Sequence, residues 1–335
     1  MTLPLSILDL APVPEGTSAP QALQDTVALA RLGDQLGYTR LWYAEHHGIP
    51  SIASSSPEVL IANAAANTHY IHVGSGGVML PNHVPLRVVE TYRTLNGLHP
   101  GRIDLGIGRA GGSDGRTLRA LRSTDGSNFS QELAELMAFD EGGFPPDHPF
   151  APITVVPEQV PLPPIYLLGS SGASAAAAGE IGAGYSFAAH FSAAPPSPAF
   201  AAYRAAFQPS VHFAKPHAIL AVSALVAPTS EEARFLSKSQ EVSWALFHSG
   251  DIRRLVPPQE AAAWPLTPQQ QAVIVNQSKL WIVGDPGEVR ATIEAQAEAA
   301  GADEVMVTTT MWSHELRLRS YRLLADAFGL TPRAF

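Results

Sequence analysis

Residues 40–50 read RLWYAEHHGIP, a short apolar and aromatic run that ends in a glutamate and two adjacent histidines. The run is typical of a buried β-strand, because aromatic and aliphatic side chains pack well on a pleated surface. Glu45, His46 and His47 follow it directly, and ionisable groups are costly to bury unless they find partners. A fold that ends a strand on these three groups must therefore give them a partner or a function.

Short apolar runs of this kind alternate with longer segments of helical period along the chain. Helices are expected at residues 19–37, 56–68, 85–98, 171–182, 198–207, 230–247 and 286–301. Eight runs have the length and composition of strands: LSILDL (5–10), RLWYAE (40–45), IHVGSGGVML (71–80), IDLGIG (103–108), PIYLLG (164–169), GYSFAAH (184–190), HAILAVSALVA (217–227) and EVMVTTT (304–310). Eight strands joined by helices predict an α/β fold, the closed (β/α)8 TIM barrel, with an open doubly wound sheet as the alternative.

Two segments interrupt the alternation. Residues 142–164, GGFPPDHPFAPITVVPEQVPLPP, contain too many prolines for an ordinary helix. Residues 250–281 are longer than a normal connection in a compact domain. We expect both to be insertions in βα loops of a single domain over residues 1–335. The second is a candidate lid over the site, with a purely structural excursion as the alternative.

The composition excludes several classes of function. The formal charge is −9 and no run of lysine or arginine occurs, which argues against a nucleic-acid surface because phosphates require clustered basic groups. The absence of cysteine excludes disulfides, thiolate nucleophiles and cysteine metal sites. No signal peptide or membrane span is expected, because no apolar stretch approaches the required length of roughly 20 residues. We therefore expect a cytoplasmic protein that acts on a small molecule.

Polar and glycine residues gather where the expected strands end, which is the end of a barrel that carries the reactive groups. Serines at a strand-to-helix junction suit a phosphate, and glycines allow a flat ligand to approach closely. The planar guanidinium of an arginine can donate paired hydrogen bonds to a phosphate or a ring carbonyl. The residues are Asp9, Glu45, His46, His47, Gly76, Gly77, Gly108, Arg109, Gly169, Ser170, Ser171, Gly172, Ser174, His190, Thr308, Thr309, Thr310 and Trp312. Together they predict a planar cofactor with a phosphate, as in a flavin site. No metal is expected, because the spacing of histidines typical of metal-binding barrels is missing.

Each of these groups alone also has a structural explanation. Two neighbouring histidines on a loop are often solvated, serines often cap helices, and glycine in a strand often marks a barrel corner. A phosphate-binding barrel without flavin, such as a lyase or isomerase, is a further alternative. Such an enzyme needs a lysine or paired carboxylates at strand ends, and none of the expected strands contains lysine.

Five segments in this order and spacing resemble the bacterial luciferase-like, flavin-dependent monooxygenases over about residues 5–328. They are LWYAEHHG (41–48), VGSGGVMLPNHVPLRVVE (73–90), HPGRIDLGIGRAGG (99–112), PIYLLGSSGASAAAAGEIG (164–182) and VGDPGEVRATIEAQAEAAGADEVMVTT (283–309). The resemblance implies a TIM barrel that binds FMN, supplied in reduced form by a separate flavin reductase. It also implies a homodimer that oxidises a small organic substrate with oxygen through a flavin peroxide.

The resemblance also assigns roles to individual residues. It makes His46 the catalytic proton donor or acceptor, with Glu45 and His47 beside it and with Glu45 or a backbone carbonyl fixing its tautomer. It places a non-proline cis peptide of the family at Gly76 and Gly77. Arg109 becomes the phosphate-associated arginine, and the phosphate loop contains Gly169, Ser170, Ser171, Gly172 and Ser174. Gly108 and Ser170 stand where luciferase has a reactive cysteine and a glutamate, so light emission is not implied.

Three alternatives to this activity remain from the sequence. A related enzyme with a deazaflavin would transfer hydride without oxygen. A non-catalytic paralogue would bind FMN only as a carrier or store. The third is the flavin-free phosphate barrel described above.

Overall fold

Eight parallel strands close into a barrel in the computed structural model, which describes residues 3–124 and 126–334. The barrel strands are β1 (Leu5–Asp9), β2 (Arg40–Tyr43), β3 (His72–Ser75), β5 (Ile103–Gly108), β6 (Ile165–Gly169), β7 (Gly184–Ala188), β8 (Ala218–Val226) and β10 (Glu304–Thr308). They lie in the order β10-β1-β2-β3-β5-β6-β7-β8, and pairing of β10 with β8 closes the ring. The predicted (β/α)8 barrel is confirmed, and the open sheet is wrong.

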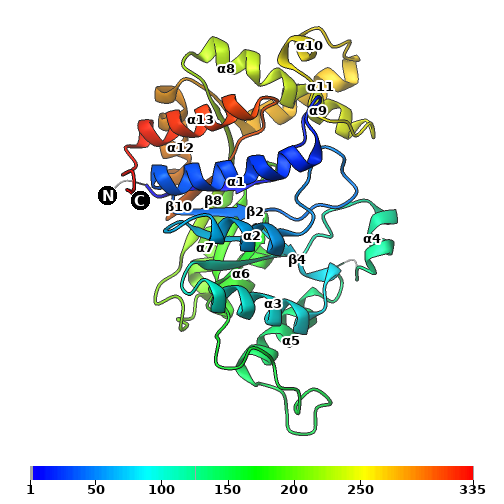
Figure 1. Ribbon diagram of the computed structural model, residues 1–335, viewed down its shortest axis with the longest axis vertical. Coiled ribbons are helices and arrows are strands. Elements are labelled where there is room, and N and C mark those ends of the chain that lie inside the picture. Colours follow the sequence, from blue (N-terminus) through cyan, green and yellow to red (C-terminus); the bar gives the residue numbers. More distant parts are fainter. Residues whose placement is uncertain (1–2, 125, 335) are drawn as a thin grey trace.

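Helices surround the strands as an outer layer (Figure 1). The helices that pack on the barrel are α1 (Ala19–Leu36), α2 (Pro57–Ala66), α3 (Pro85–Leu98), α5 (Phe129–Glu141), α6 (Gly172–Glu180), α7 (Pro196–Ala206), α12 (Pro286–Ala300) and α13 (His314–Phe328). Local capping residues set the ends of α1. The Ser18 hydroxyl accepts a hydrogen bond from the Gln21 amide at its start, and Gly37 ends the helix in a left-handed conformation. The sequence did not predict α5 and α13.

Two strand assignments differ from the expectation. The run at residues 71–80 is broken by a cis peptide between Gly76 and Gly77, and β4 (Val78–Met79) resumes beyond it along β5. The cis peptide therefore lies where the family resemblance placed it. An additional strand, β9 (Trp281–Gly284), pairs with the end of β8 outside the ring. It was missed because it has only four residues and begins at Trp281, the last residue of the segment assigned to an insertion.

The proline-rich segment 142–164 contains no helix or strand and lies between α5 and β6. It therefore connects a helix to a strand, and it is not a βα loop as expected. In Figure 1 it extends from the end of the molecule opposite to α8 (Ser230–Leu236), α10 (Pro258–Ala262) and α11 (Pro268–Gln277). Phe139, Phe144 and Phe150 pack against one another at its base, with ring centroids 4.8 to 5.8 Å apart. Its proline content explains the lack of regular structure.

The second insertion belongs to the long connection between β8 and α12. It forms α10 (Pro258–Ala262) and α11 (Pro268–Gln277), which pack on α9 (Lys238–His248). Only its first part, at Ile252, Arg253 and Leu255, reaches the central cavity described below. A lid role for residues 250–281 remains a prediction that this arrangement does not test.

Paired charges fill the amino-terminal half of the barrel interior. Arg40 in β2 contacts Asp104 in β5 and Glu304 in β10, each at 2.7 Å, and all three side chains are buried. Burial would raise the pKa of both carboxyls, but the Arg40 guanidinium lowers the pKa of each to about 2. The charged cluster of Arg40, Asp104 and Glu304 therefore occupies the barrel below the carboxyl ends of the strands.

Within the described ranges, no helix has the length and apolar character that crossing a bilayer requires.

Replacing Arg40 with methionine should lower the free energy of unfolding by about 3–5 kcal/mol, because two buried carboxylates lose their cation. Urea denaturation followed by circular dichroism measures this change. Arg87→Met is the matched control, because Arg87 is exposed and its pair with Glu90 should contribute less than about 1 kcal/mol. Equal small losses in both variants would contradict the importance of the buried cluster.

Candidate active site

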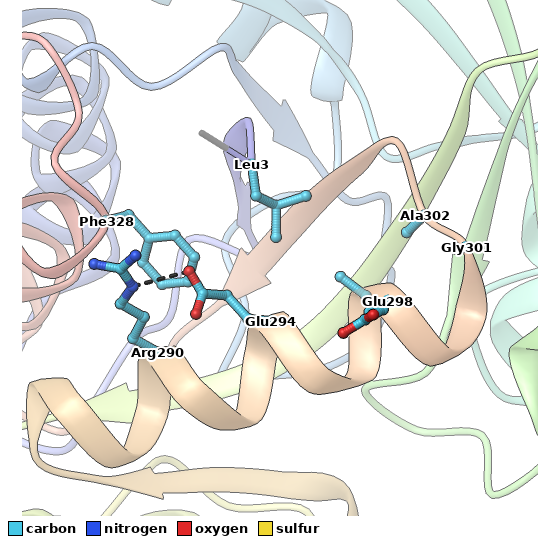
Figure 2. A pocket seen from close by; sticks show the side chains of 8 residues that line it. Leu3, Arg290, Glu294, Glu298, Gly301, Ala302 and Phe328 are labelled. Atoms are coloured by element: carbon cyan, nitrogen blue, oxygen red, sulfur yellow. Dashed lines mark hydrogen bonds and ion pairs between the residues drawn. The ribbon is translucent and has the colours of Figure 1, made fainter. Parts of the chain in front are cut away.

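A cavity of about 960 Å³ opens at the carboxyl ends of the barrel strands. Its walls include residues that follow β1, β2, β5, β6, β7 and β10, together with one side of α9. A second hollow of about 560 Å³ lies at the opposite end of the barrel, beside Leu3, Ala302 and the carboxyl half of α12. Figure 2 shows that its charged side chains include the Arg290–Glu294 ion pair. Twelve of the eighteen residues of the predicted polar rim line the first cavity. The six that do not are Asp9, Glu45, His47, Gly77, Gly172 and Trp312.

Glu45 follows β2 and is fully buried. Its carboxylate accepts hydrogen bonds from the Met79 amide at 2.9 Å, the Asn82 side chain at 3.1 Å, and the Nε2 atoms of His47 and His83 at 2.9 Å. Burial would raise the pKa of Glu45, but the bonds from His83, His47 and Met79 lower it overall. Glu45 is therefore an ionised anchor between the loop after β2 and the segment after β4, and it does not line the cavity.

His46 lines the cavity, and its Nδ1 atom lies 3.2 Å from the Gly112 carbonyl oxygen. A carbonyl can only accept, so Nδ1 carries the proton and Nε2 is left as an acceptor in the neutral ring. Burial lowers the pKa of His46 below its ordinary value, although the Gly112 bond and Glu45 oppose this. The backbone carbonyl, and not Glu45, therefore fixes the tautomer.

His47 turns away from the cavity toward Glu45. Its backbone carbonyl accepts a hydrogen bond from the Ser113 hydroxyl at 2.5 Å. These contacts place His47 where it holds the loop, beside the reactive space and not within it.

The junction of β6 and α6 has the features of an anion site. Gly169, Ser170, Ser171 and Ser174 line the cavity there, whereas Gly172 does not. Ser171 precedes the helix, but its side chain makes no capping bond, so the first amides of α6 keep their donor capacity. The Ser171 carbonyl accepts from the Ser174 and Tyr185 hydroxyls, both at 3.1 Å, which hold the loop from behind.

Arg109 follows β5 at the exposed edge of the same cavity. Within the described chain its side chain forms no ion pair or hydrogen bond, so its guanidinium is available to an anion. Gly76 also lines the cavity, and a Cβ atom there would lie 2.7 Å from Leu8. Gly77 packs instead against the Gly106 carbonyl and does not line the cavity.

Other cavity residues were not assigned a role from the sequence. His190 follows β7, and its Nδ1 atom lies 3.4 Å from the Ala221 carbonyl oxygen. Burial lowers the pKa of His190 to about 4, and the charge of His46 contributes to the decrease. The sequence placed His190 at a strand end but gave no partner for it. His83, the partner of Glu45, lies only a few residues beyond the expected third strand, a signal that was available and not used.

The chain matches the family model described as luciferase-like monooxygenase over residues 3–304. It is 40% identical to a protein of Escherichia coli K12 with the name luciferase-like monooxygenase, and the aligned region covers 97% of each chain. It is 34% identical to N-acetyl-S-alkylcysteine monooxygenase of Bacillus subtilis, covering 96% and 97%. The crystal structure of apo-MsnO8 is 38% identical, covers 99% of each chain and has a TM-score of 0.89.

Two more distant solved structures share the fold. The oxygenating constituent of 3,6-diketocamphane monooxygenase from Pseudomonas putida, in complex with FMN, is 19% identical, covers 100% of each chain and has a TM-score of 0.72. An F420-dependent secondary alcohol dehydrogenase is 14% identical, covers 98% and 99%, and has a TM-score of 0.66. At these identities the likeness concerns the fold alone.

The low pKa of His190 predicts an NMR titration with a midpoint near pH 4, which leaves the ring neutral at pH 7. His190→Gln identifies the signal by its loss. The unfolded chain takes up this proton near the ordinary value of 6.5, so the folded state should lose stability as the pH falls from about 6.5 to about 4. A midpoint above pH 6 would contradict the buried, carbonyl-bonded geometry.

Proposed function

The chain belongs to the luciferase-like monooxygenase family and is an oxidoreductase, and on this basis we propose that it oxidises a small organic substrate with oxygen and reduced FMN. The observation that carries the proposal is the meeting of three features in one cavity. They are the uncapped start of α6, Gly76, and Arg109, which has no partner among the described residues. This donor set fits a phosphate group on a planar ring. When bound, reduced FMN would supply the activation of oxygen.

The protein residues would contribute binding, orientation and proton movement. The α6 amides, Ser171 and Arg109 would hold the phosphate. His46 presents an unprotonated Nε2 to the cavity and would accept a proton there and return it later. Apolar side chains around it, including Leu8, Trp42 and Met306, would exclude water from the reacting groups.

Glu45 and His47 would act as positioning residues in this account. Their mutual hydrogen bond and the bonds of Glu45 to Met79 and His83 hold the loop that carries His46. They would set the place of the His46 ring without touching the substrate.

Two partners also belong to the proposal. A separate flavin reductase would supply reduced FMN. A second copy of the chain would form a homodimer, for which the exposed apolar side chains Val59, Val84 and Leu98 on or next to α2 and α3 are a suitable surface.

A deazaflavin-dependent hydride transfer is the second candidate, because the fold is shared with an F420-dependent dehydrogenase. The phosphate donors would serve either cofactor, so the ring must be identified directly. The protein is titrated anaerobically with oxidised FMN, photoreduced FMN and F420, and air is then admitted while absorbance is recorded. Tight binding of reduced FMN, with reoxidation in air that follows a different absorbance time course from that of free reduced FMN, supports the monooxygenase. Binding of F420 alone supports hydride transfer, and FMN binding without substrate turnover indicates a carrier.

Replacing His46 with alanine should reduce turnover by about 10²–10⁴-fold, the usual contribution of a general acid or base, and change FMN affinity little. Steady-state rates with a flavin reductase and fluorescence titration with FMN measure the two effects. His69→Ala is the control, because the His69 side chain is exposed and lies outside the cavity. Unchanged turnover in His46→Ala would refute the assignment.

Replacing Arg109 with methionine should weaken FMN binding by about 10- to 100-fold, the value of a hydrogen bond to a charged group. Riboflavin, which lacks the phosphate, should bind equally to both forms. The exposed Arg116, outside the cavity, provides the control variant Arg116→Met. An equal loss for FMN and riboflavin would show that Arg109 does not contact the phosphate.

A further inference from the structure

The cavity has one wall whose polar groups have no role in the account above. This wall comes from β7, β8 and α9. Its polar side chains are Ser186, His190, Ser223, Gln240 and Ser243. All of them can hydrogen-bond, and none is a carboxylate, lysine or arginine. The wall therefore suits a polar group without a full charge.

His190 and His46 present the same kind of atom to this cavity. Each ring has Nδ1 directed at a backbone carbonyl oxygen, at 3.4 Å in His190 and 3.2 Å in His46. Both Nδ1 atoms must donate, so both Nε2 atoms are acceptors. Neither Nε2 atom has a hydrogen-bond partner in the described parts of the chain. Two acceptors without a protein partner in one cavity suit a ligand that brings a donor.

Ser223 and Gln240 form a hydrogen-bonded pair in the same wall of the cavity. Both side chains are buried, and the Gln240 amide donates to the Ser223 hydroxyl oxygen at 3.2 Å. The Ser223 hydroxyl hydrogen and the Gln240 carbonyl oxygen keep their capacity for a ligand. Burying such groups without a partner is costly, so a ligand that bonds to them gains affinity.

Among the described residues that line the cavity, each arginine has a partner or a proposed role, which leaves no cation for an anionic substrate. Arg317 contacts Asp9 at 2.6 Å, and Arg253 contacts Asp251 at 2.9 Å. Arg109 is the third, and under the proposed function it holds the phosphate. A carboxylate or sulfonate on the substrate would therefore enter without a matching charge.

We propose that His46, His190, Ser223 and Gln240 bind an uncharged substrate through a hydroxyl or N–H group, while apolar walls enclose the remainder. Leu8, Trp42, Trp244 and Phe247 supply those walls. His190 is then a specificity-determining residue that distinguishes substrates with a donor from those without one. This inference rests on the proposed function, because it assigns Arg109 to the cofactor.

The test uses three probes with one ring system: 2-naphthol as a neutral donor, 2-methoxynaphthalene as a neutral molecule without a donor, and 2-naphthoate as an anion. Calorimetric titrations at pH 7 are made with the full chain, with and without FMN. We expect 2-naphthol to bind at least about 10-fold more tightly than the other two, the value of one well-made hydrogen bond. His190→Phe should remove this preference, and Ser223→Ala should reduce it. The exposed-site control His69→Phe should retain it.

The proposal is overturned if 2-naphthoate binds most tightly, if the methoxy compound equals 2-naphthol, or if none of the probes binds. A preference retained in both His190→Phe and Ser223→Ala also overturns it. The FMN titration is recorded separately. If FMN fails to bind while the naphthol preference persists, the cofactor proposal fails and the substrate subsite stands.

Discussion

The buried cluster of Arg40, Asp104 and Glu304 determines where this barrel can hold a ligand. It joins β2, β5 and β10 across the barrel interior, and the Ser6 hydroxyl in β1 donates to Glu304 at 2.5 Å. The Trp42 indole donates to Asp104 at 2.9 Å and lies between the cluster and the cavity. Charges buried this deeply must remain paired, so the amino-terminal half of the barrel is closed to other occupants. Inward positions nearer the carboxyl ends carry small residues such as Gly76, Gly108 and Ala221, and these leave the cavity open.

Above the charged cluster, the cavity combines a loop after β2 that Glu45 holds in place with walls from several strands and helices. Glu45 ties the loop after β2 to the segment after β4, and the Gly112 carbonyl sets the tautomer of His46. The phosphate donors lie at the start of α6, and the neutral polar wall lies on β7, β8 and α9. Under the two proposals, α6 and Arg109 would bind the cofactor, whereas proton transfer and substrate recognition would share His46.

Much of the fold was predictable because local patterns carry it. The eight barrel strands lie within the expected runs, although the run at 71–80 is broken after Ser75. The seven expected helical segments are helical, although residues 230–247 divide into α8 and α9. The polar rim marks the correct end of the barrel. Pairings between distant segments were not predictable, since no local pattern specifies them. Three partners of Glu45, namely Met79, Asn82 and His83, are 34 to 38 residues away, and β9 becomes a strand only by pairing with β8. His190 shows the same limit: its strand-end position could be predicted, but its contact with the Ala221 carbonyl could not.

A crystal structure of the protein with FMN, prepared under anaerobic reducing conditions, tests the central claim most directly. The account predicts the phosphate within hydrogen-bond distance of the first amides of α6 and the Arg109 guanidinium. It also predicts the flavin ring against Gly76, with His46 on the same side of the cavity as the reacting part of the ring. A phosphate bound elsewhere, or a ring outside the cavity, would contradict the account.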